Sequence, residues 1–139
     1  MRRALATGLV GLTLLLSPAL ARADLSEVAR THIAPRYDAF ALTTRALADT
    51  AESTCRGPAI QAAYQTAFDA WMDVSHIQFS PIEDEHLTLA TAYCPDPKNR
   101  TGRALAGLFV QQDPVVADPQ AFAEVSVAAQ GVFALKRPL

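Results

Sequence analysis

Apolar residues recur every three or four positions along most of residues 24–139, and this periodicity constrains the fold more than any other feature of the sequence. Alternation of the kind that predicts strands is scarce, and glycine and proline gather between the periodic segments. The pattern predicts an all-α protein in which amphipathic helices, joined by short links, form an antiparallel up-down helical bundle.

Four helices are expected. Proline lacks an amide donor, so Pro35 either kinks or restarts the first helix, and Pro81 ends the second. Pro58 is well placed as the first residue of the second helix, and Asp118 as the N-cap of the fourth. One further helical turn is expected over residues 86–92. The helices cover residues 25–53, the segment from 58 to Pro81, residues 100–112, and the segment from 118 towards the end of the sequence.

Each helix has an apolar face that needs partners to bury it. The expected faces are Tyr37, Phe40, Thr44, Leu47 and Ala51 in the first helix, Ile60, Tyr64, Ala67, Trp71, Val74 and Gln78 in the second, Leu105, Leu108 and Phe109 in the third, and Phe122, Val125, Ala129 and Phe133 in the fourth.

Residues 1–23 have the features of a secretory signal peptide. Arg2 and Arg3 precede a short apolar run over residues 9–16, and small residues stand at the two positions that a signal peptidase reads, which predicts cleavage after Ala23. The run is shorter than the roughly 20 apolar residues that cross a bilayer. We therefore expect a periplasmic or envelope protein whose exported domain covers residues 24–139.

The exported chain is acidic. Without the three arginines of the leader, nine of the 12 basic residues remain against 14 acidic ones, a net charge of about −5. This balance disfavours nucleic acid, which needs clustered lysine and arginine. No other segment is long and apolar enough to predict a membrane span.

The two cysteines, Cys55 and Cys94, both fall in expected connections between helices. In an oxidising compartment they form a possible disulfide, worth roughly 4 kcal/mol in the chain-entropy model. Two unpaired thiols are the alternative, because the sequence does not bring the Cα atoms within the required ~7 Å. Neither cysteine belongs to a C-x-x-C or zinc-type motif.

Several residues have side chains that can ligate a metal, but their spacing matches no known metal-binding motif. His76, His86 and the acidic residues 83–85 could ligate a metal, but their spacing does not place two of them on one helix face, and a solvated acidic loop is the favoured interpretation. His32 is expected to border the core. Trp71 is expected either in the core, which is favoured, or on a ligand-facing surface.

Three stretches together resemble the imelysin family. Residues 70–83 are similar to the family's tryptophan and F-G-P-I segment, residues 93–105 to its aromatic-W-P-D-x-x-N…G-R-x-L stretch, and residues 113–131 to the approach to its signature. Ser80 and Cys94 replace the usual glycine and tryptophan. The resemblance implies an exported, envelope-associated helical protein from a family named for an insulin-cleaving protease and linked to iron uptake. Because the family fold is a pair of helical bundles, the resemblance implies that this chain is the first bundle, truncated before the second; a naturally short, one-bundle member is the alternative.

The family signature, G-x-H-x-x-E, aligns with Gly131, and it then places Phe133 at the histidine and Lys136 at the glutamate. Phenylalanine neither ligates a metal nor transfers protons, and lysine repels a cation. We therefore assign no catalytic and no metal-ligating residue. Trp71, Asp96 and Gly131 remain as ligand-facing or structural candidates, and the residues identify no cofactor.

Three functions follow as hypotheses. The first is a non-catalytic envelope binding protein, connected with iron uptake or another ligand, whose partner would be the missing second bundle or another envelope protein. The second is a metallopeptidase-like enzyme, and the third is a degenerate fragment without independent function.

Overall fold

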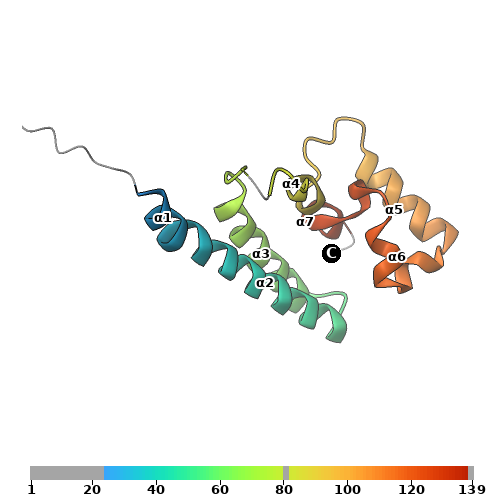
Figure 1. Ribbon diagram of the computed structural model, residues 1–139. Helices are drawn as coiled ribbons and strands as arrows, with labels where there is room; N and C mark the ends of the chain where they lie inside the picture. Colours follow the sequence, from blue (N-terminus) through green and yellow to red (C-terminus); the bar gives the residue numbers. More distant parts are fainter. Residues whose placement is uncertain (1–23, 80–81, 138–139) are drawn as a thin grey trace, which may run out of the picture.

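The computed structural model describes residues 24–79 and 82–137, and within these ranges it is an all-α helical bundle, as the periodicity predicted. The helices α2 (Ala34–Ser53) and α3 (Pro58–Val74) lie side by side and antiparallel, and the shorter helices that follow α3 gather on one side of this pair (Figure 1). The expected signal peptide and Pro81 lie outside the described residues. None of the helices in the described ranges has the length and apolar character that a bilayer crossing requires.

The first helical segment follows the expected bounds closely. It begins with α1 (Leu25–Val28), widens into a π-helical turn, η1 (Ala29–Ile33), and continues as α2. The turn precedes Pro35, which cannot donate to the carbonyl four residues earlier, and the amide of Ala34 instead bonds the carbonyl of Ala29. Proline therefore loosens the helix locally without ending it.

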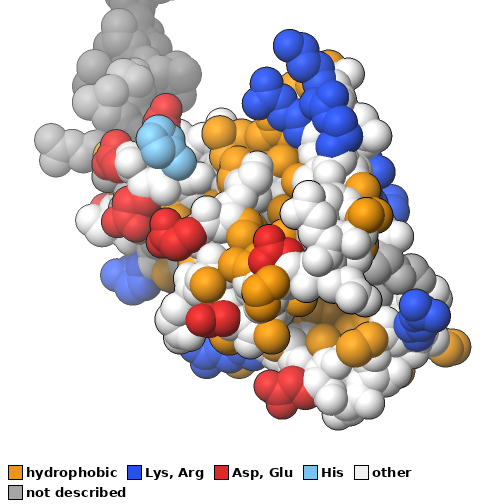
Figure 2. Space-filling view, turned by 90° about the vertical axis from the view of Figure 1, so that its right-hand side faces the viewer, with side chains coloured by type: hydrophobic (Ala, Val, Ile, Leu, Met, Phe, Trp, Pro, Cys, Tyr) orange, Lys and Arg blue, Asp and Glu red, His pale blue; other side chains and the backbone are white. Residues whose placement is uncertain are grey.

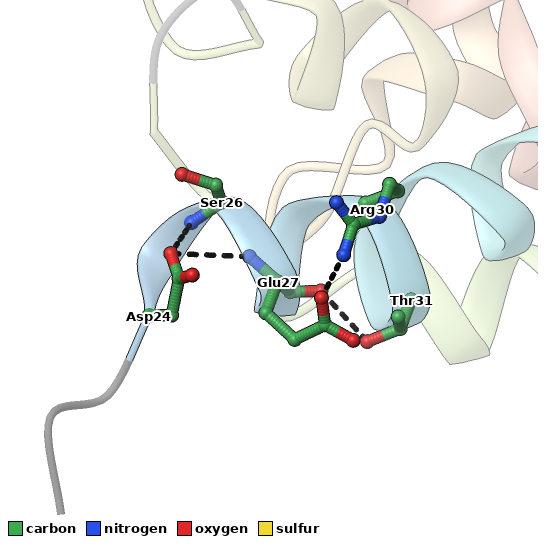
Figure 3. Close-up of polar contacts among 5 residues, drawn as sticks. All are labelled: Asp24, Ser26, Glu27, Arg30 and Thr31. Carbon is green, nitrogen blue, oxygen red and sulfur yellow. Dashed lines mark hydrogen bonds and ion pairs between the residues drawn. The ribbon is translucent and has the colours of Figure 1, made fainter.

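The N-terminus of α1 is closed by a side chain (Figure 3). A carboxylate oxygen of Asp24 accepts hydrogen bonds from the amides of Ser26 (2.9 Å) and Glu27 (3.4 Å), which the helix cannot satisfy itself. One turn on, Glu27 pairs with Arg30, and the Thr31 hydroxyl donates to the Glu27 carbonyl. The N-cap of the first described helix is thus the residue that follows the expected cleavage position.

The stripe expected on α3 forms the centre of the core. Its members Ile60, Tyr64, Ala67, Trp71 and Val74 are all buried, and Leu47 of α2, Ile77, Ala92 and Val132 join them. Tyr37, Phe40 and Ala51 of α2 pack against this cluster and are partly buried. The apolar faces of the two long helices were therefore predicted correctly.

The end of α3 was predicted wrongly. The helix stops at Val74, well before Pro81, and Gln78 is exposed. The Gln78 side chain donates to the carbonyl of Ser75, a group that a longer helix would pair with a backbone amide, and the Ser75 hydroxyl bonds the carbonyl of Met72. Local side-chain bonds compete here with continuation of the helix.

The third helix was predicted well in extent but not in orientation. Helix α5 (Arg100–Gln111) matches the expected bounds, and the short α4 (Leu87–Thr91) matches the expected turn. Leu105 and Leu108 are half-buried, whereas Phe109 is 60% exposed. The buried side of α5 passes through Thr101 at spacings of four and three, and Phe109 lies about 100° further round the helix.

The single fourth helix was the largest error. Asp118 caps α6 (Pro119–Ala123) as expected, but the chain then passes through a 3-10 turn, η3 (Val127–Ala129), before α7 (Gly131–Leu135). The Gln130 amide group donates to three carbonyls, those of Phe122, Ala123 and Val125, and so closes the end of α6. The expected apolar face is still inside the fold, because Ala129 is buried and the other members are half-buried.

Candidate functional site

A pocket of about 450 Å³ lies where the start of α5 meets the end of α7. The segment before α5 and its first turn supply one wall, and α7 with the two residues after it supplies the other. The lining residues are Tyr93, Cys94, Asp96, Thr101, Phe133, Lys136 and Arg137. The fold thus brings the two substituted signature positions, 133 and 136, together with the candidate Asp96.

Asp96 closes the N-terminus of α5. One carboxylate oxygen accepts the amide of Arg100 at 2.7 Å and the other the amide of Thr101 at 2.9 Å. Desolvation alone would raise the pKa of Asp96, but these bonds, a bond from the buried Thr101 hydroxyl and the charge of Arg137 outweigh it and lower the pKa. The side chain therefore enters the pocket as a carboxylate already held by backbone donors.

Arg137 connects the two walls. Its guanidinium donates to the side-chain oxygen of Asn99 at 2.8 Å, and Asn99 directly precedes α5. This bond orients the arginine and joins segments 38 residues apart in the sequence. Lys136 is exposed and makes no side-chain hydrogen bond or ion pair in the described part of the chain, so it is available to a ligand.

Gly131 sets the position of α7. Its φ of +74° lies in the left-handed region that favours glycine, and a Cβ there would come within 2.2 Å of the Thr91 carbonyl oxygen. The absence of a side chain thus lets the start of α7 lie against the end of α4. On the next residue, the Val132 carbonyl accepts a buried hydrogen bond from the Tyr64 hydroxyl at 3.2 Å, and burial raises the pKa of that hydroxyl.

Phe133 is held by aromatic contacts. Its ring meets Phe68 edge-on, with 5.9 Å between ring centroids, and Phe68 in turn stacks on Tyr64 at 5.9 Å. The ring is half-buried and also lines the pocket, so it joins the core to the site. At the position where the signature has an imidazole, the pocket has a fixed apolar surface.

The other candidates lie elsewhere. Trp71 is only 7% exposed and packs against Phe40 in the core, with 5.7 Å between ring centroids. Both cysteines are free and exposed: Cys94 lines the pocket, whereas Cys55 lies in the link between α2 and α3. Of the three ligand-facing or structural candidates, Asp96 lines the pocket, Gly131 positions one wall, and Trp71 supports the core.

The histidines and acidic residues outside the pocket do not converge. Glu83, Asp84, Glu85 and His86 are exposed, and the described ranges contain no group of three or more His, Cys, Asp or Glu side chains that could hold a metal. His32 and His76 do meet, edge-on with ring centroids 6.4 Å apart. No sequence pattern predicted this contact, because it joins the turn before α2 to the segment that follows α3.

Sequence reasoning also missed three of the lining residues. Tyr93 and Thr101 fall inside the stretch that resembles the family motif, so that stretch was a usable signal. Arg137 had none, because its role depends on the folded contact with Asn99.

Comparison with known families matches residues 33–137 to the imelysin model. The matched region contains every residue that lines the pocket. No curated protein and no solved structure matches the chain.

Proposed function

This chain belongs to the imelysin family, and from that premise we propose that it is an exported, envelope-associated binding protein without catalytic activity. The observation that carries the proposal is the content of the pocket at the two signature positions. Phe133 offers no donor atom, and the Lys136 ammonium repels a cation, so this pair does not support metal activation of water. An open concave surface with oriented polar groups remains, which suits binding.

The export part of the proposal rests on the sequence of residues 1–23 and on the start of the helical structure. Asp24 caps the first helix, so cleavage after Ala23 removes none of the described helices. The intact mass of the protein recovered from the envelope fraction should correspond to a chain that begins at Asp24. Recovery of the uncleaved chain from the cytoplasm would contradict export.

The acidic balance of the exported chain supports a ligand other than nucleic acid. The family's link to iron uptake makes an envelope uptake process the expected setting.

Hydrolysis assays separate this function from the metallopeptidase alternative. Purified exported protein should leave insulin and casein intact, with and without added zinc or iron. Cleavage that requires the metal and disappears with a chelator would establish the enzyme instead.

Binding is tested directly by two-dimensional NMR of the isotope-labelled protein with a set of small organic fragments. Shifts confined to the amides around Phe133 and Lys136 are expected. A thermal melt followed by circular dichroism should show a cooperative helical transition, and a gradual, non-cooperative loss of helix would favour the degenerate-fragment alternative.

A further inference from the structure

We propose that the pocket binds a small organic anion, with its acid group at Lys136 and its apolar body on Phe133. The inference rests on the proposed binding function and names the chemical class of the ligand.

The charges at the rim favour an anion. Lys136 and Arg137 both line the pocket, and Arg137 is oriented by its bond to Asn99. The Lys136 ammonium has no partner among the described residues and can form a charge-assisted hydrogen bond to an incoming carboxylate, and such bonds are stronger than neutral ones. The acid group of a ligand can therefore replace water at Lys136, and the positive charge of the neighbouring Arg137 adds to the attraction.

Asp96 opposes an anion less than its charge suggests. Its two oxygens accept hydrogen bonds from backbone amides at the start of α5, and these donors partly compensate the negative charge of the carboxylate. The two cations of the pocket outnumber this single carboxylate. The net charge of the lining is thus positive.

Further basic residues flank the lining residues in the sequence. Lys98, Arg100 and Arg103 are exposed on the segment that forms one wall and on the first turn of α5. Figure 2 shows a group of basic side chains at the upper right of the face that it draws, apart from most of the acidic ones. This local excess stands out because the exported chain as a whole is acidic, and it attracts anions to the pocket mouth.

The remaining lining specifies an apolar body. Phe133 is held by Phe68, and Tyr93 lies half-buried on the opposite wall. A volume of about 450 Å³ suits a small molecule rather than a peptide segment. Together these features favour a ligand that is an aromatic or similarly flat organic acid.

A matched pair of probes tests the charge requirement. We would titrate isotope-labelled exported protein with 2-naphthoate and, separately, with 2-naphthamide, which has the same shape but no charge. Naphthoate should shift the amides around Asp96, Phe133 and Lys136, and naphthamide should bind roughly tenfold more weakly, the difference expected for one charge-assisted bond. Added salt should weaken only naphthoate binding.

Two variants locate the effect. Lys136→Gln should reduce the affinity for naphthoate to about that for naphthamide, whereas Arg45→Gln, at an exposed arginine of α2 outside the lining, should change it less than about twofold. Equal binding of both probes to the wild-type pocket, or unchanged naphthoate binding by Lys136→Gln, would overturn the anion inference and leave the binding function standing. Pocket amides that respond to neither probe would overturn both.

Discussion

Replacing Gly131 with alanine tests whether the close approach of α7 to α4 holds the pocket wall in place. A Cβ at this position would lie 2.2 Å from the carbonyl oxygen of Thr91 and 2.6 Å from that of Ala90. Both oxygens belong to the backbone of α4, so the clash can be relieved only by moving a helix end. The φ of +74° adds a second cost, because alanine rarely adopts it.

The two costs set the expected size of the effect. A left-handed conformation costs a residue with a side chain about 1–2 kcal/mol, and forcing extra volume into a packed site about 1–3 kcal/mol. The sum, roughly 2–5 kcal/mol, is a large part of the 5–15 kcal/mol that typically stabilises a domain. Because α7 presents Phe133 and Lys136 to the pocket, ligand binding should weaken together with stability.

Urea unfolding followed by circular dichroism measures this change, and two other glycines provide matched controls. Gly57 has a φ of +101° but no atom within 4 Å of an added Cβ, so Gly57→Ala should show only the conformational cost, about 1–3 kcal/mol. Gly107 lies inside α5, also in open space, and Gly107→Ala should stabilise the protein by about 0.5–1 kcal/mol. If Gly131→Ala costs no more than Gly57→Ala, the argument from close packing is refuted.

Three further substitutions follow from single contacts. The folded protein lowers the pKa of Asp96 below its ordinary value of 3.8, so the ionised carboxylate stabilises the fold above that value, and this stability is lost as the pH falls through the folded pKa. At neutral pH, Asp96→Asn should therefore melt at a lower temperature than the wild type. In thermal melts at decreasing pH, the variant should lack the acid-dependent loss of stability that this carboxylate causes in the wild type. Tyr64→Phe should lower the free energy of unfolding in urea by about 0.5–1.5 kcal/mol, and Tyr37→Phe should lower it less. The hydrogen bond of the Tyr64 hydroxyl is buried and 3.2 Å long, whereas that of the Tyr37 hydroxyl is 3.5 Å long. A larger loss for Tyr37→Phe would contradict the view that the Tyr64 bond is the stronger of the two. Gln130→Ala removes three hydrogen bonds to carbonyls near the end of α6 and should cost about 1–3 kcal/mol, and a value near zero would mean that water replaces them.

The long helices were predictable because their information is local. The stripe from Ile60 to Val74 repeats at helical spacing, and all five of its apolar members are buried. The break between α6 and α7 was not predictable in this way. It depends on the Gln130 side chain reaching back to carbonyls five to eight residues earlier, and the apolar periodicity continues through the break.

The site was predictable in its parts but not as an assembly. The family resemblance singled out Asp96, Gly131, Phe133 and Lys136. The meeting of Asp96, Phe133 and Lys136 in one pocket depends on α7 folding back beside the start of α5, a long-range contact that no local pattern encodes. The same limit explains why Arg137 was missed. Trp71 was predictable, because its place in the stripe of α3 favoured the core position that it occupies.

The central claim is that the charge at position 136 selects the ligand of this pocket. The most direct measurement is the ratio of the 2-naphthoate and 2-naphthamide affinities in the wild type and in Lys136→Glu, with circular dichroism to show that both proteins are folded. We predict that the wild type prefers the acid and that the variant loses this preference, with a change in the ratio of roughly tenfold or more. A folded variant that keeps the preference of the wild type would contradict the claim.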